Sequence, residues 1–246
     1  MSEFGRPQFE SLMSEAVRLH GEGQYEAALA SSTQAYKMAP DDSLEKGRAA
    51  RDNSAHCGRL GLIDDAGWWA LEAYTIHDGL VQSMDEPTRK AFRERSASAM
   101  YVGLIGLRKA IQSMRGKQGG IDSSTITYMR QAWSDLRAAN SLAPSGINRW
   151  VDQYGVNVAW RVSLAETLLG DRKKGFAIGA RAVGLAFMSE SPKLDTSNPN
   201  LSTKQRMRAK VKALVGGVAA VTVSSLASPK DNRRHQAALA LADRML

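Results

Sequence analysis

The chain has 246 residues, of which 43% are hydrophobic and 24% are charged, a composition that is typical of a folded protein and excludes a disordered one. Its net charge is +8, and the whole excess lies from Ser145 onward, where 16 basic residues stand against 7 acidic ones, which favours an acidic partner or a well-solvated basic surface. A single cysteine, Cys57, excludes an internal disulfide framework and a cysteine-rich metal site, and we expect it to be a buried thiol.

The chain is predicted to be helical almost throughout. Small and apolar residues recur at helical spacing, and no stretch alternates with period two. After a flexible lead over residues 1–8, the predicted helices are 9–21, 25–38, 44–60, 64–77, 87–114, 125–142, 148–169, 173–188, 202–226 and 232–246. Consecutive pairs give one domain over residues 9–246, built of hairpins at 9–40, 44–78, 87–144, 148–188 and 202–246. We therefore predict an all-α protein.

Pairs of small residues, seven apart, mark the second helix of four hairpins. Seven residues are two helical turns, so both members of a pair share one face, and another helix can pack closely against it. A proline follows two of the pairs and ends the helix, because it has no N–H to donate. The sets are Ala28, Ala35 and Pro40; Ala66 and Ala73; Ala132, Ala139 and Pro144; and Gly175 and Ala182.

The first hairpin resembles the tetratricopeptide repeat in Ala16, Gly23, Tyr25, Ala28, Ala35 and Pro40. The likeness is good over residues 9–78, fair over 125–188 and weak beyond residue 200. It implies an α-solenoid of about five antiparallel helical hairpins, wound as a right-handed superhelix whose concave face is lined by the first helix of each hairpin. A divergent last unit is expected, because a terminal repeat caps the stack.

The resemblance also implies which residues line the concave face of the first two hairpins: Glu10, Met13, Val17, His20, Arg48, Arg51, Asp52, Ala55 and Arg59. Arg48, Arg51 and Arg59 share one stripe of their helix, and guanidinium groups bind carboxylates or phosphates through paired hydrogen bonds. A solvated helix face is the alternative. Some family members clamp a partner's C-terminal carboxylate with lysines and asparagines at set positions of this face. Three of these positions hold Met13, Val17 and Asp52 in this chain, so we do not expect binding of that kind.

Two adjacent tryptophans, Trp68 and Trp69, lie on the second helix of the second hairpin. Neighbouring helical residues point about 100° apart. We expect one ring to pack between repeats and Trp68 to contact a partner at the surface, where tryptophan is enriched. Core packing of both rings is the alternative.

A basic patch is predicted in the C-terminal part of the chain. Its members could bind the phosphates of a nucleic acid in a salt-dependent way. However, no aromatic residues are interleaved with them for base stacking, and a solvated face is the alternative. The patch consists of Arg172, Lys173, Lys174, Lys204, Arg206, Arg208, Lys210 and Lys212.

The uncharged run Ala213–Ala227 is shorter than the roughly 20 apolar residues that span a membrane. We expect it to be a buried helix, packed tightly through Gly216 and Gly217, and we expect no membrane association. No apolar segment follows Met1, which favours a cytoplasmic location.

The four histidines are scattered, and no metal-binding or catalytic motif occurs. We therefore expect no enzymatic activity, no metal and no cofactor. The sequence predicts a scaffold or adaptor that binds another protein or peptide, with acidic groups, on its concave face. Two alternatives stay open: a helical protein that associates with nucleic acid through its basic C-terminal part, and a structural subunit that self-assembles into a homo-oligomer.

Overall fold

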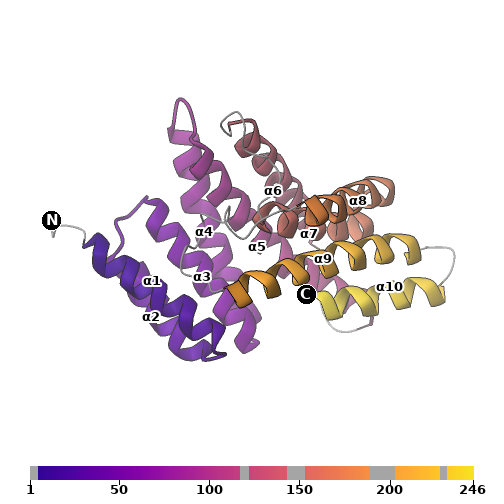
Figure 1. Cartoon of the computed structure of the whole chain (residues 1–246), viewed down its shortest axis with the longest axis horizontal. Coiled ribbons are helices and arrows are strands. Elements are labelled where there is room, and N and C mark those ends of the chain that lie inside the picture. The colour runs from indigo at the N-terminus through magenta and orange to yellow at the C-terminus, as the bar shows by residue number, and fades with distance from the viewer. Residues whose placement is uncertain (1–4, 117–121, 143–152, 189–202, 228–231) are drawn as a thin grey trace. The chain divides into compact units, whose positions relative to one another are not determined.

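The computed structural model describes residues 5–116, 122–142, 153–188, 203–227 and 232–246, and this part of the chain is helical without any strand (Figure 1). The prediction of an all-α protein is confirmed. The helices of the described residues are α1 (Arg6–Gly21), α2 (Tyr25–Met38), α3 (Leu44–Leu60), α4 (Ile63–Ser83), α5 (Arg89–Met114), α6 (Ser124–Ser141), α7 (Gln153–Leu169), α8 (Arg172–Met188), α9 (Thr203–Leu226) and α10 (Asn232–Met245).

Helices α2 and α3 have the predicted bounds, whereas α1 and α4 are longer than expected. Helix α1 begins at Arg6, inside the predicted flexible lead, and Pro7 is tolerated there because the first turn of a helix does not use that N–H. Helix α4 begins at Ile63 and continues through Asp78-Gly79 to Ser83, beyond its predicted end at residue 77. The Asp78 carboxylate accepts a hydrogen bond from Gln82 one turn later, at 2.7 Å, which suits a continuing helix.

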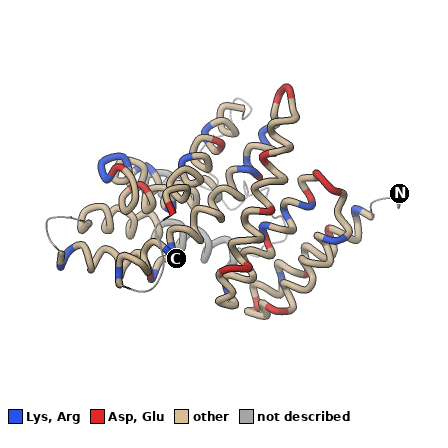
Figure 2. Tube along the Cα trace, turned by 180° about the vertical axis from the view of Figure 1, so that it is seen from behind, with Lys and Arg blue, Asp and Glu red and all other residues tan. Residues whose placement is uncertain are grey.

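The chain folds into two compact units, and the division between them falls within α5. The N-terminal unit comprises residues 1–105 and the C-terminal unit residues 106–246. The N-terminal unit has 11 basic and 16 acidic residues, a balance of −5, whereas the C-terminal unit has 22 and 9, a balance of +13. The charged positions are coloured along the trace in Figure 2. The two units therefore carry net charges of opposite sign.

The small residues spaced seven apart face other helices, as predicted. Their burial lets neighbouring backbones approach, and in the N-terminal unit α1, α2, α3 and α4 pack against one another in sequence order. Larger residues fill the remaining space: Phe9 and Met13 pack against Ala35 and Ala49, and Ile105 packs against Cys57, which is 2% exposed. The buried small residues are Ala28, Ala35, Ala66, Ala73, Ala132, Ala139, Gly175 and Ala182.

The second and the fourth hairpin each contain a hydrogen bond from a serine hydroxyl to a backbone carbonyl, at corresponding positions. Ser54 of α3 donates its hydroxyl to the carbonyl oxygen of Ala66 on α4, at 2.7 Å. Ser163 of α7 donates in the same way to the carbonyl oxygen of Gly175 on α8, at 2.6 Å. In both cases the acceptor is the first of the two small residues and follows the serine by 12 positions. The two hairpins thus share an internal contact as well as a sequence pattern.

In the C-terminal unit, α7, α8 and α9 all contact one another, α6 packs on α7, and α10 packs on α9. Glycines in α9 allow this close packing: a Cβ on Gly216 would lie 2.8 Å from the Trp160 ring, and one on Gly217 would lie 3.2 Å from Val183. The expected tight packing through Gly216 and Gly217 is confirmed. The run is buried on one side only, however, since Val215 is 60% exposed.

None of the helices in the described part of the chain has both the length and the hydrophobicity that crossing a membrane requires.

Candidate functional site

Helix α3 carries the arginine stripe that the sequence singled out, and both of its ends are fixed locally. At the N-terminus, the Ser43 hydroxyl accepts a hydrogen bond from the backbone N–H of Lys46, at 3.1 Å. At the C-terminus, Gly61 adopts φ 77°, a left-handed conformation that favours glycine. These two caps set the bounds of α3 and therefore the positions of its three arginines along the helix.

Arg51 is held inside the N-terminal unit, between two carboxylates. Its guanidinium donates to Glu94 of α5 and, at 3.3 Å, to Asp52 of α3. Burial alone would raise the pKa of Glu94, but the positive charge of Arg51, with contributions from His77 and Arg48, holds that pKa below its usual value. Arg51 therefore ties α3 to α5, and its charge is already matched within the unit.

The other two arginines of the stripe are nearer to solvent. Arg48 is partly exposed and lies 3.4 Å from the Glu10 carboxylate, an ion pair in which both side chains reach water. Arg59 is exposed on the last turn of α3. Of the three predicted arginines, Arg59 is thus the most open to a partner.

Met13 was predicted to line the concave face, and this is wrong. Its side chain is fully buried and packs with Phe9 in the core of the N-terminal unit. Phe9 and Met13 are one turn apart on α1, so they share the face that α1 turns toward its neighbours. Val17, one turn further, is only partly buried.

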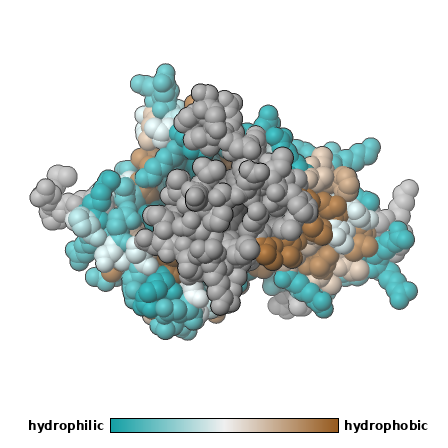
Figure 3. All heavy atoms as spheres, in the orientation of Figure 1, coloured by the Kyte–Doolittle hydropathy of each residue, from teal (hydrophilic) through white to brown (hydrophobic). Residues whose placement is uncertain are grey.

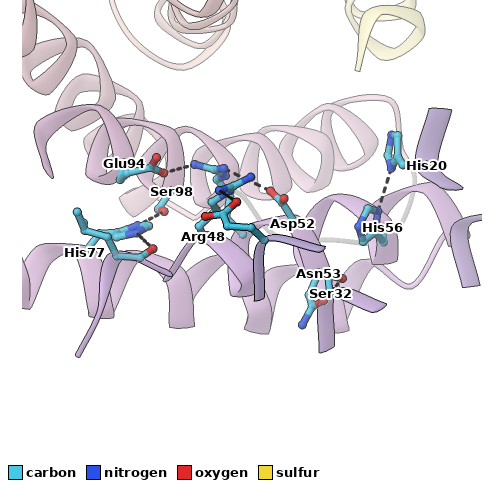
Figure 4. Close-up of polar contacts among 12 residues, drawn as sticks. His20, Ser32, Arg48, Asp52, Asn53, His56, His77, Glu94 and Ser98 are labelled. Atoms are coloured by element: carbon cyan, nitrogen blue, oxygen red, sulfur yellow. Dashed lines mark hydrogen bonds and ion pairs between the residues drawn. The ribbon is translucent and has the colours of Figure 1, made fainter. Parts of the chain in front are cut away.

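His20 meets His56 of α3 through the two Nδ1 atoms, which are 2.9 Å apart (Figure 4). One ring must donate and the other accept, so the contact holds at least one neutral imidazole. Burial lowers the pKa of His56 to about 4, although the negative charge of Asp52 acts to raise it. The rings of Tyr25 and His20 also pack in an edge-to-face arrangement, with their centroids 5.1 Å apart. His20 is therefore part of the packing between α1 and α3.

A second buried histidine, His77, was not singled out by the sequence. Its Nδ1 lies 2.8 Å from the Ser98 hydroxyl of α5, and the ring is completely buried. Gly47 makes room for it, since a Cβ there would lie 2.3 Å from Nε2. Burial lowers the pKa of His77 to about 4. Gly47, within α3, is the sequence signal that could have indicated a close neighbour at this place.

The two tryptophans separate, and the alternative of core packing for both rings is wrong. Trp69 packs edge-on against Tyr36, at a centroid distance of 4.9 Å, and contributes to the core. Trp68 rests its ring against Trp69 but is 57% exposed. An exposed tryptophan on a fixed helix provides a rigid apolar contact for another surface.

The basic patch is partly occupied by internal contacts. The buried carboxylate of Glu166 accepts two hydrogen bonds from Arg130, at 2.9 and 3.0 Å, and pairs with Lys174 at 2.9 Å. Burial would raise the pKa of Glu166, but these partners lower it to about 2. Arg172 donates to the carbonyl oxygen of Ser224, at 2.8 Å, whereas Lys173 is exposed. The side chains of Lys204, Arg206, Arg208, Lys210 and Lys212 lie outside the described residues.

Reactive groups in the described residues do not assemble into a recognisable centre. Within those residues, no three His, Cys, Asp or Glu side chains are grouped so as to hold a metal ion. Cys57 is free and buried, and burial raises the pKa of its thiol, which disfavours the nucleophilic thiolate. The polar groups of the N-terminal unit instead join its helices to one another.

In its described residues the chain is all-α, and helices α1 to α4 of the N-terminal unit pack in sequence order. No protein-family model and no curated protein matches the sequence.

Proposed function

We propose that this chain is a non-catalytic helical-repeat scaffold of the tetratricopeptide type, which binds a segment of another protein. The observation that carries the proposal is the pair of serine–carbonyl contacts, Ser54 to Ala66 and Ser163 to Gly175. The same contact at the same spacing in two hairpins supports a repeated structural unit. In the proposed fold, about five hairpins stack into a right-handed superhelix with one concave face.

The proposed binding surface is the face shared by the first helices of the first two hairpins, α1 and α3. Val17, Arg48, Asp52 and Arg59 belong to it, while Arg51 supports it from within through Glu94. Arg59 is the exposed cation of this surface, and its planar guanidinium suits a carboxylate of an acidic segment. We therefore assign the recognition of acidic groups chiefly to Arg59.

Replacing Arg59 with glutamate should weaken partner binding by at least about 10-fold, because the favourable charge pair becomes a repulsive one. The partner is first identified by affinity purification and mass spectrometry with the wild-type chain, and its affinity is then measured by calorimetric titration. Lys37→Glu, at an exposed position on α2, is the matched control and should bind as the wild type does. If Arg59→Glu binds with unchanged affinity, the assigned surface is wrong.

A second candidate function is nucleic-acid association, and the observation that favours it is the +13 balance of the C-terminal unit. Such binding would neutralise backbone phosphates and release counterions, so its affinity should fall steeply with salt. A labelled single-stranded RNA titrated at several salt concentrations tests this, with Lys173→Glu as a variant that should weaken binding modestly. Absent or salt-independent binding would exclude this candidate.

A further inference from the structure

Helix α4 presents an exposed stripe of mixed apolar and acidic character. Asp64, Trp68, Leu71 and Thr75 are all exposed and follow one another at intervals of four, three and four residues, so they lie on one side of the helix. Trp68 and Leu71 are the apolar centre of this α4 stripe, at 57% and 47% exposure. The helix carries four acidic residues and neither lysine nor arginine.

Helix α9 presents a stripe with the same spacing. Val211, Val215, Val218 and Thr222 are exposed and again follow one another at intervals of four, three and four residues. In Figure 3, hydrophobic residues gather on the visible face over the part of the molecule where Figure 1 places the C-terminal half of α9. The sequence of this helix holds five basic residues and no acidic one. The α9 stripe is therefore apolar, and the basic residues of the helix lie at its N-terminal end, between Lys204 and Lys212.

The two stripes are complementary in three respects. Both use the alternating spacing of three and four residues at which helices pack side by side. Each exposes large apolar side chains that lose contact with water when covered. The helices that carry them have opposite charge, and so do the units to which they belong, −5 and +13. One molecule thus carries both halves of a matched contact.

We propose that the α4 stripe of one copy of this chain docks on the α9 stripe of a second copy. The contact is heterologous, because each copy contributes a different surface. The second stripe of each copy can then bind either the same partner or a further copy. This self-association does not rest on the proposed partner-binding function, since Arg59 and the α1–α3 face take no part in it.

The test uses sedimentation velocity of the full chain over a range of concentrations, with one variant for each stripe. Trp68→Ser/Leu71→Ser disables the α4 stripe, and Val215→Asp disables the α9 stripe; all three positions are exposed, so the fold should persist, as checked by circular dichroism. The wild type should associate increasingly as its concentration rises. Each variant alone should sediment as a monomer, while an equimolar mixture of the two should form a dimer and nothing larger, because one intact contact remains.

Leu142→Ser is the matched control, since Leu142 is exposed to a similar degree, 50%, and belongs to neither stripe. It should associate as the wild type does. Three outcomes overturn the proposal: a wild type that stays monomeric at every concentration, a variant that still associates by itself, or a mixture of the two variants that remains monomeric.

Discussion

Replacing Gly175 with alanine is expected to lower the free energy of unfolding by about 2–3 kcal/mol. A Cβ at this position would lie 2.3 Å from the Thr167 hydroxyl and 2.8 Å from two backbone atoms, the Ser163 carbonyl oxygen and the Thr167 nitrogen. Backbone atoms cannot rotate away, so α7 and α8 must separate and the Ser163 hydrogen bond to Gly175 must lengthen. This cost outweighs the gain of about 1 kcal/mol that alanine brings to a helix. Urea unfolding followed by circular dichroism measures the difference.

Gly79→Ala is the matched control for this substitution. Gly79 lies within α4, and a Cβ there would have no neighbour within 4 Å. The control should be neutral or more stable than the wild type, because only the helix preference of alanine acts. If Gly175→Ala were as stable as this control, the close approach of α7 and α8 would be refuted.

The N-terminal unit is expected to lose stability as the pH falls from about 6.5 toward 4. Burial lowers the folded-state pKa of His77 from an ordinary value near 6.5 to about 4, so between these values the unfolded chain binds more protons than the folded one. The contribution of the uncharged His77 to the free energy of unfolding is complete above about pH 6.5 and is lost as the pH decreases. A shift of this size corresponds to roughly 3 kcal/mol from His77. His56 shifts in the same direction and adds to the slope.

Urea unfolding at a series of pH values tests this expectation. His77→Gln removes one titrating group, so the dependence of stability on pH should become shallower, whatever the absolute stability of the variant. Ser98→Ala removes the hydrogen-bond partner of His77 but keeps the imidazole, and it should retain the wild-type slope. An equal slope in His77→Gln and the wild type would show that His77 does not govern the acid response.

Most helices could be predicted from the sequence because their ends are determined locally. Ser43 caps α3 at its start and Gly61 ends it, and Ala39-Pro40 ends α2, so these bounds needed no knowledge of distant residues. The end of α4 could not be found in this way. Asp78 is bound by Arg95 of α5, at 2.8 Å, so the extra turns of α4 pack against a segment that local sequence does not reveal.

The candidate site was only partly predictable, for a related reason. Helical spacing correctly placed Arg48, Arg51 and Arg59 on one stripe of α3. It could not show that Glu94, which is 43 residues away from Arg51, approaches that stripe and neutralises one member. The burial of Met13 likewise depends on which face of α1 meets its neighbours, and the helical spacing of the apolar residues along α1 leaves that choice open.

Cys57 gives the N-terminal unit a built-in reporter of its own opening. Because this lone thiol is shielded in the interior, a bulky thiol-modifying reagent can reach it only after α3 and its neighbours have moved apart. The rate at which the reagent labels Cys57, compared with its rate in the unfolded chain, therefore measures the local opening of the N-terminal unit. No cysteine has to be engineered for this measurement.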